Sequence, residues 1–223
     1  MEAARTASRI IGALILTQMV CAALINFVLE APLFGTPGFL VNAAAHAPQI
    51  ALAALLGLAT GALSVGIAIT AYPVFSQCSQ AMALWFIALS VAGFSVTAVE
   101  NINVMSMLSL SMEYAKANAA AQDQLQALRV IVASPRNWAH YIGLIIAGST
   151  IFVMYAVLYR FALVPRALAG FGLAAVVLQL VAVAMPLFGQ GIVFLLLAPL
   201  GLSQLAVALW LILKGFRKEG VTP

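Results

Sequence analysis

The sequence predicts an all-α polytopic membrane protein, a bundle of six transmembrane helices in a single domain over residues 1–223. Two observations lead to this class. Of the 223 residues, 65% are hydrophobic and only 7% are charged, whereas soluble domains carry about 25% charged residues. The apolar residues also form runs of about 20, the length of a membrane-spanning helix. A chain this apolar excludes an ordinary soluble enzyme, a disordered protein and a nucleic-acid binder.

Six apolar segments have the length of a membrane span. They do not alternate between apolar and polar residues as the strands of a transmembrane barrel would, so helices are expected. The first segment reaches about Leu29 without a clear cleavage site, and it is expected to be a retained helix and not a signal peptide. The predicted spans cover about 10–30, 49–72, 81–108, 137–159, 166–187 and 191–213.

Prolines mark the expected helix boundaries. Pro73 is expected to stop the second span, because proline disfavours helix at the residue before it. Ser134 and Pro135 have the pattern of an N-cap followed by a first helical proline, and they are expected to open the fourth span. Pro165 is expected to open the fifth span in the same way. Pro199 lies inside the sixth span, where a missing backbone hydrogen bond predicts a kink.

The basic residues predict the orientation, because cytoplasmic loops carry an excess of Lys and Arg. With the N-terminus inside, seven basic residues lie on the cytoplasmic side and three on the outer side. Both termini are therefore expected in the cytoplasm. The cytoplasmic set is Arg5, Arg9, Arg160, Arg166, Lys214, Arg217 and Lys218, and the outer set is Lys116, Arg129 and Arg136.

The longest polar stretch, 113–136, connects the third and fourth spans on the outer side. Apolar residues at helical spacing predict a short helix there, either lying on the membrane surface or capping the bundle as a connector. Gly57 and Gly61 form a GxxxG motif, which is expected to allow close packing within the chain. Cys21 and Cys78 are expected in the first span and in a cytoplasmic loop, where they cannot easily form a disulfide.

Glu100 is the charged residue predicted well inside a span, and ionisable groups there indicate functional sites by default. Steps of three and four residues along its helix give a small, polar face that includes Thr97 and Asn103. His140 lies near the outer entrance of the fourth span. We therefore expect Glu100 and His140 to form a hydrogen-bonded pair at the centre of a polar pocket open to the outer side.

Further polar residues fall in the outer half of the spans. Asn26 and Glu30 lie four residues apart on the first span, and Gln179 lies on the fifth. A purely structural role stays open for each: a polar network for Glu100, a backbone hydrogen bond for His140, solvation for Glu30, and interhelical hydrogen bonding for Gln179. The candidate ligand-binding residues are Glu100, His140, Asn103, Thr97, Asn26 and Gln179.

Metal and catalytic chemistry are only weakly indicated. His46, His140 and Glu100 are suitable metal-ligand types, but no HxxxH, ExxH or HExxH spacing occurs. No GxSxG motif occurs either. The sequence therefore predicts no catalytic residue, no metal site and no cofactor, and it leaves open whether the protein is an enzyme, with the balance against one.

Four segments carry a family resemblance: Arg9–Gly12, Ile142–Gly148, the stretch from Leu158–Arg160 to Val164–Leu168, and Ala208–Gly215. With them the chain resembles, over nearly its whole length, a bacterial family of six-span membrane proteins, domain-of-unknown-function family 4386. The resemblance implies the six-span topology and a bacterial inner membrane. It implies no activity and no functional residue.

The leading functional prediction is a membrane protein that binds or senses a small or lipidic ligand from the outer side. Its partners would be the lipid bilayer, this ligand and a membrane protein of a larger complex. No nucleic acid is expected, because the basic residues end apolar runs instead of forming a stripe. Three alternatives stay open: a proton- or cation-coupled transporter using Glu100, a metal-dependent membrane enzyme, and a structural or assembly protein.

Overall fold

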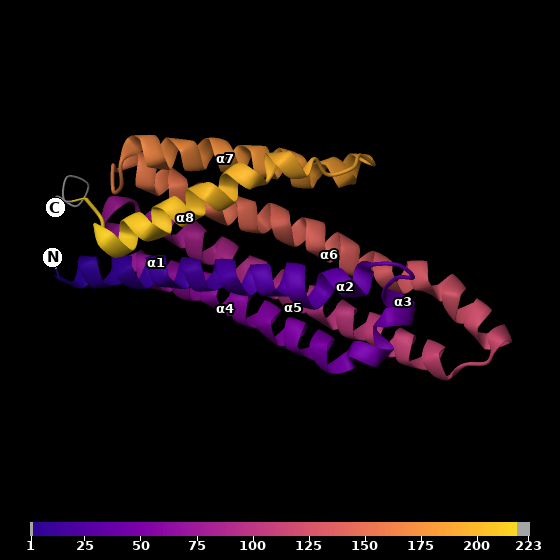
Figure 1. Ribbon diagram of the computed structural model, residues 1–223. Helices are drawn as coiled ribbons and strands as arrows, with labels where there is room; N and C mark the ends of the chain where they lie inside the picture. Colours follow the sequence, from indigo (N-terminus) through magenta and orange to yellow (C-terminus); the bar gives the residue numbers. More distant parts are fainter. Residues whose placement is uncertain (1, 218–223) are drawn as a thin grey trace. The chain divides into compact units, whose positions relative to one another are not determined.

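The computed structural model describes residues 2–217, and all regular elements in that range are helices (Figure 1). Six helical segments are long and apolar enough to cross a membrane, which confirms the predicted fold class. The chain is therefore a multi-span membrane protein. Lys218, one of the predicted orientation signals, lies outside the described residues. The six segments are Glu2–Glu30, Ala44–Cys78, Gln80–Lys116, Ala119–Arg160, Arg166–Phe188 and Phe194–Leu213.

The long α-helices are α1 (Glu2–Ala23), α4 (Ala47–Cys78), α5 (Gln80–Lys116), α6 (Ala119–Arg160), α7 (Arg166–Ala184) and α8 (Ala198–Leu213). A π-helix, Leu24–Glu30, continues α1. The shorter elements are α2 (Ala31–Phe34), α3 (Phe39–Asn42) and three 3₁₀ turns at Ala44–His46, Met185–Phe188 and Phe194–Leu196.

The chain divides into two compact units. Unit 1 comprises Met1–Gln18, Ala62–Phe94 and Gly143–Pro223, and unit 2 comprises Met19–Gly61 and Ser95–Ile142. Helices α1, α4, α5 and α6 each contribute residues to both units. The sequence-based prediction of one transmembrane domain stays a prediction.

The second span does not stop at Pro73, as the sequence predicted. Helix α4 continues through this proline to Cys78. The added turns bury Val74 and Phe75, which are 4% and 2% exposed, and the Phe75 ring lies 5.6 Å from that of Phe86. Burial of these side chains offsets the single backbone hydrogen bond that the proline removes.

The prediction that Pro135 opens the fourth span is also wrong. Helix α6 begins at Ala119 and runs without interruption to Arg160, with Pro135 inside it. Val132 and Ala133, just before the proline, pack against a buried apolar cluster of unit 2, which holds the helix in place there. The stretch 113–136 is therefore not a separate connecting helix: α5 extends to Lys116, and only a short turn separates it from α6.

The other two prolines used in the sequence analysis, Pro165 and Pro199, lie at the beginnings of helices. Pro165 is the N-cap residue of α7, so the predicted start of the fifth span is confirmed. Pro199 lies in the first turn of α8 and not in its interior. The predicted kink is wrong, because first-turn residues have no intrahelical acceptor for their N–H groups and proline removes nothing there.

Unit 1 is held together by close helix packing. Gly12 in α1 lies against α8, where an added Cβ would come within 2.6 Å of the Ala208 carbonyl oxygen. Helices α7 and α8 pack against each other. The fully buried Tyr155 of α6 donates a hydrogen bond from its hydroxyl to Ser203 Oγ on α8 at 3.1 Å.

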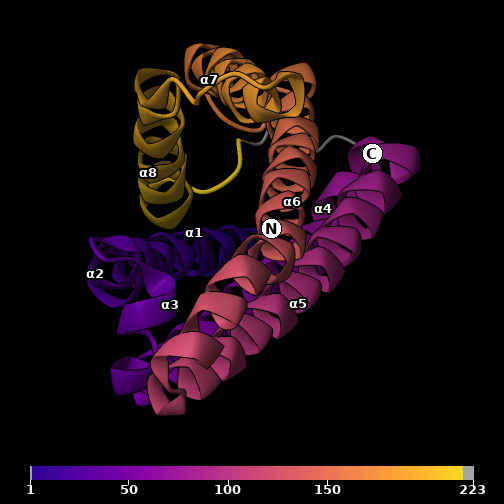
Figure 2. The ribbon, with the colours of Figure 1, turned by 90° about the vertical axis from the view of Figure 1, so that its right-hand side faces the viewer.

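Unit 2 is built around the halves of α5 and α6 nearest their connecting turn, which form a hairpin with α3 beside it (Figures 1 and 2). Buried Ser111 of α5 fastens this region: its Oγ donates to Leu40 O at 2.7 Å and accepts from Ala44 N–H at 2.9 Å. Gly57 of α4 faces Asn101 of α5, whose Nδ2 lies 3.0 Å from the place a Cβ would occupy. The first glycine of the GxxxG motif thus serves packing within the chain.

Candidate functional site

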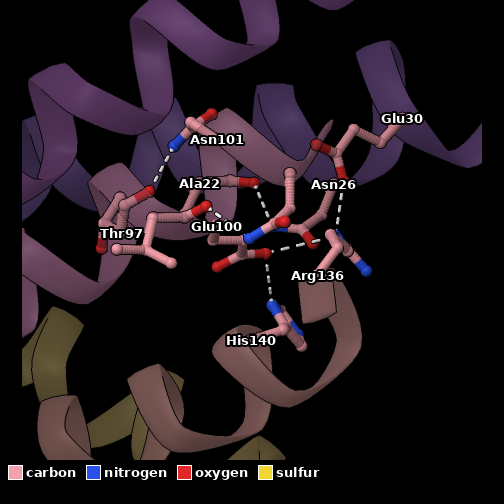
Figure 3. Close-up of polar contacts among 10 residues, drawn as sticks. Ala22, Asn26, Glu30, Thr97, Glu100, Asn101, Arg136 and His140 are labelled. Atoms are coloured by element: carbon pink, nitrogen blue, oxygen red, sulfur yellow. Dashed lines mark hydrogen bonds and ion pairs between the residues drawn. The ribbon is translucent and has the colours of Figure 1, made fainter. Parts of the chain in front are cut away.

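Four ionisable side chains meet inside unit 2, and we call them the ion cluster: Glu30, Glu100, Arg136 and His140 (Figure 3). Arg136 Nη2 lies 3.4 Å from Glu30 Oε2 and 3.3 Å from Glu100 Oε1. His140 Nδ1 lies 2.9 Å from the same Glu100 oxygen. The cluster joins the end of the first span to α5 and α6.

The π-helix brings Glu30 into this cluster. Glu30 is the last residue of the π stretch, whose wider turn changes the direction of the side chains that follow α1. Within the stretch, Asn26 donates from Nδ2 to the Ala22 carbonyl at 2.8 Å. The expectation that Glu30 would be solvated is not met, because its side chain is 19% exposed and paired with Arg136.

Arg136 is the site residue that the sequence analysis missed. It was counted among the outer loop charges, because Pro135 was expected to begin the helix. In the continuous α6, Arg136 and His140 are one turn apart and point the same way. The i, i+4 spacing of a cation and a histidine was the available signal, and it required accepting a proline inside the helix.

The cluster is largely withdrawn from solvent. Its side chains are 13% exposed at Arg136, 19% at Glu30, 20% at Glu100 and 33% at His140. Two carboxylates share the one guanidinium of Arg136, and His140 pairs with one of these carboxylates. Arg136 Nε is buried without a hydrogen-bond partner among residues 2–217. Buried charges of this kind are stable only as a set, since removing one partner leaves another uncompensated.

The other predicted ligand-binding residues do not join the ion cluster: they bond within their own helix or belong to unit 1. Asn103 donates to the Val99 carbonyl of its own helix at 2.8 Å, as Asn26 does on the first span. Thr97 accepts at its carbonyl oxygen from Asn101 Nδ2 at 2.8 Å. Gln179 belongs to unit 1, where its Oε1 is buried without a hydrogen-bond partner among the described residues.

The weak metal candidates are not grouped as ligands. His46 is exposed, and its Nδ1 lies 2.8 Å from the Asn42 carbonyl oxygen. Within residues 2–217, no three His, Cys, Asp or Glu side chains are arranged to hold a metal ion.

A cavity of about 550 Å³ lies in unit 2 beside the ion cluster. Its walls come from α2, α3 and the α5–α6 hairpin, and they are mainly aromatic and aliphatic. None of the six predicted ligand-binding residues is among its lining residues in the described range. The lining residues are Phe34, Phe39, Leu40, Met107, Leu110, Arg129, Val130, Val132, Ala133, Ser134, Asn137, Trp138 and Tyr141.

Two aromatic side chains connect the cluster to the cavity. The Arg136 guanidinium carbon lies 5.2 Å from the centroid of the Phe34 ring, within the range of a cation–π contact. The His140 and Tyr141 rings have centroids 5.8 Å apart. Phe34 and Tyr141 also line the cavity, so the ion cluster and the cavity wall are in contact through these two residues.

Comparison with known proteins agrees with the resemblance read from the sequence. A family model described as Domain of unknown function (DUF4386) matches residues 10–215, which is most of the chain. The chain belongs to this family. The match to DUF4386 covers all six helices of the chain that are long enough to cross a membrane, except for the first turns of α1. No curated protein and no solved structure matches the chain.

Proposed function

We propose that unit 2 binds a single-chain anionic amphiphile, such as a fatty acid, with its apolar chain in the 550 Å³ cavity. The observation that carries this proposal is the cavity itself. Small-molecule sites are typically concavities of about 300–1,000 Å³, mostly apolar, with a few polar groups that fix orientation. This member of the DUF4386 family has such a concavity next to the partly buried ion cluster.

The lining favours an amphiphile over a purely polar ligand. Phe39, Leu40 and Met107 form a buried apolar wall, suited to a hydrocarbon chain. Arg129 and Asn137 add a cation and an amide, and both side chains are exposed. A carboxylate or phosphate beside Arg129 would gain a charge-assisted hydrogen bond while its chain leaves water.

The helix lengths favour a position at the membrane boundary. Helix α6 has 42 residues and α5 has 37, or roughly 63 and 55 Å at about 1.5 Å per residue. A bilayer core is about 30 Å thick, so both helices extend beyond it. The cavity lies along the ends of these helices nearest their connecting turn, where a ligand could enter from the lipid or from water.

Fluorescence quenching by 9,10-dibromostearate tests this proposal. The variant W85F/W210F keeps Trp138, which lines the cavity, as its single tryptophan. We expect saturable quenching, because bromine quenches indole on contact. The control W138F/W210F keeps Trp85, which is 63% exposed and outside the cavity, and its quenching should rise linearly with probe.

Filling the cavity provides a second arm of this test. Ala133→Phe places a ring among the lining residues, and Ala127→Phe places the same ring on an exposed position of α6. Saturable quenching of Trp138 should disappear in the first variant and persist in the second. Linear quenching of Trp138 in the unfilled protein would contradict the proposal.

A second candidate function is proton or cation transport, and the ion cluster favours it. Its two carboxylates and one guanidinium leave room for one proton, and buried ionisable groups of membrane helices often form proton pathways. In proteoliposomes with a potassium diffusion potential and an internal pH dye, Glu100→Gln should abolish the flux. Glu113→Gln, at an exposed pair, is the matched control. Flux no greater than in empty liposomes would contradict this candidate.

The orientation of the protein in the membrane is also a proposal. Both termini are proposed to face the cytoplasm of a bacterial inner membrane, supported by the seven-to-three bias of basic residues. Alkaline phosphatase fused in the turn at Ala117 should be active, and a C-terminal fusion should be inactive. The reverse pattern would place the cavity on the cytoplasmic side.

A further inference from the structure

A second recess, of about 880 Å³, lies in unit 1 and has three basic lining residues, against one in the cavity of unit 2. Three separate parts of unit 1 line it: the first turns of α1, the last turns of α4, and the segment after α8. Figure 1 shows the N-terminal end of α1 and the C-terminal end of α8 close together. Its charged lining residues are Arg5, Lys214 and Arg217, with Glu2 as the acidic one.

The backbone around this recess is firmly held. Gly215, two residues after the end of α8, has φ +76°, a left-handed conformation, and an added Cβ would lie 3.1 Å from Ser8 Oγ. Ser8 is fully buried and donates to the Arg5 carbonyl at 2.8 Å. Arg217 donates its backbone N–H to the Leu163 carbonyl at 2.8 Å. The cations on both sides of the recess therefore start from fixed backbone positions.

The basic side chains of the recess form no close ion pair within the described residues. In residues 2–217, none of Arg5, Lys214 and Arg217 has a carboxylate within 4.0 Å. The Arg217 guanidinium instead stacks over the Trp210 ring at 5.8 Å. Gln77 of α4 adds an amide donor to the lining. Three cations, an amide and the first turn of a long helix together form an environment for an anion.

We propose that this recess binds the phosphate of an anionic phospholipid headgroup. The recess lies at the ends of helices that cross the membrane, and basic pockets between such ends recognise lipid phosphates. Arginine matches phosphate oxygens with paired N–H donors, and a lysine adds a mobile point charge. The site is independent of the amphiphile proposed for unit 2, since it involves other residues and another unit.

Native mass spectrometry of the full-length protein with added phosphatidylglycerol tests the site. The triple variant R5Q/K214Q/R217Q removes its cations, and R9Q/R160Q/R166Q removes three exposed arginines of unit 1 that do not line the recess. Each basic residue that contacts a lipid phosphate contributes roughly a five-fold change in affinity, and the arginines outside the recess would make no such contact with a lipid bound there. We expect phosphatidylglycerol to bind at least about ten-fold more weakly to the first variant, and within about two-fold of the unchanged protein for the second.

Two further arms make the outcome decisive. Glu2→Gln removes the acidic lining residue from an exposed position, so it should raise affinity without affecting folding. Inorganic phosphate should fail to displace the lipid at millimolar concentration. Equal weakening in both triple variants would overturn the proposal in favour of a diffuse charge effect. Displacement by phosphate alone would overturn the lipid assignment in favour of a soluble phosphate compound.

Discussion

Units 1 and 2 use different means to hold membrane helices together. Unit 1 relies on small residues: Gly12, Gly148 and Gly172 each lie where a Cβ would collide with a neighbouring helix. In its described part no ion pair within 4.0 Å occurs. Unit 2 relies on ion pairs between distant segments and on a serine that bridges two backbone groups.

The two kinds of contact differ in how they tolerate change. Tightly packed glycine contacts have one geometry and lose stability when altered. A cluster of two carboxylates, a guanidinium and an imidazole can be rebuilt when a proton or a ligand arrives. The cavity beside the cluster belongs to the same unit, so the ion cluster and the cavity occur together in unit 2.

The largest expected effect comes from removing the cation of the ion cluster. Arg136→Met leaves Glu30 and Glu100 without their shared partner, and breaking such a buried pair costs about 3 kcal/mol of unfolding free energy. Unfolding by SDS titration would measure the loss. Adding Glu100→Gln should recover part of it, because one uncompensated charge is gone.

Arg129→Met is the matched control for this change. It removes the same side chain from an exposed position of the same helix, so stability should stay within about 0.5 kcal/mol. Equal stability of the two variants would show that the cluster holds unit 2 together no better than a surface charge.

The next effect tests the glycine packing of unit 1. Gly172→Ala pushes a methyl group into the ring of fully buried Tyr155, and such overpacking costs about 1–3 kcal/mol. Gly201→Ala is the control, because nothing lies within 4 Å of its added Cβ. In a thermal unfolding assay the first variant should melt lower, and the second should match or exceed the unchanged protein. A lower melting temperature for both would argue against a specific contact.

A smaller and more local effect is expected at Ser111. Ser111→Ala leaves the Leu40 carbonyl and the Ala44 N–H without their partner, at a cost of about 1–2 kcal/mol. Hydrogen exchange should accelerate mainly over 31–48. Ser109→Ala, which removes only an exposed bond to the Met105 carbonyl of its own helix, should leave that segment unchanged.

The smallest effect is predicted at the exposed pair of Glu113 and Lys116. Their side chains are 66% and 67% exposed, and surface pairs contribute about 0–1 kcal/mol. Glu113→Gln should therefore change the SDS midpoint by less than Arg136→Met does. A comparable loss would mean that exposure does not separate the two kinds of ion pair in this protein.

The sequence was sufficient for the fold class, the number of spans and the pairing of Glu100 with His140. Composition and helix periodicity predict these features directly. A membrane-spanning helix requires a long apolar run, and a carboxylate inside such a helix is stable only beside a polar or charged partner. The helix boundaries predicted at Pro73 and Pro135 were wrong. The burial that stabilises a proline-containing helix depends on segments far away in the sequence.

The cavity and the role of Arg136 could not be predicted from the sequence either, because both depend on contacts between distant segments. A residue assigned to a loop cannot be placed on a helix face, so the error at Pro135 concealed the guanidinium between two carboxylates. The cavity wall combines α2, α3 and the hairpin, which share no sequence signal. The pocket predicted around Glu100 was polar, whereas the cavity that lies beside the cluster is mainly apolar.

Hydrogen-exchange mass spectrometry with and without oleate tests the central claim most directly. The account predicts slower exchange on adding oleate in 34–40, 107–110 and 129–141 of unit 2, with no change over α7 and α8 of unit 1. Ala133→Phe should abolish this protection. Unchanged exchange in those three segments, or equal protection over α7 and α8, would contradict the assignment of ligand binding to unit 2.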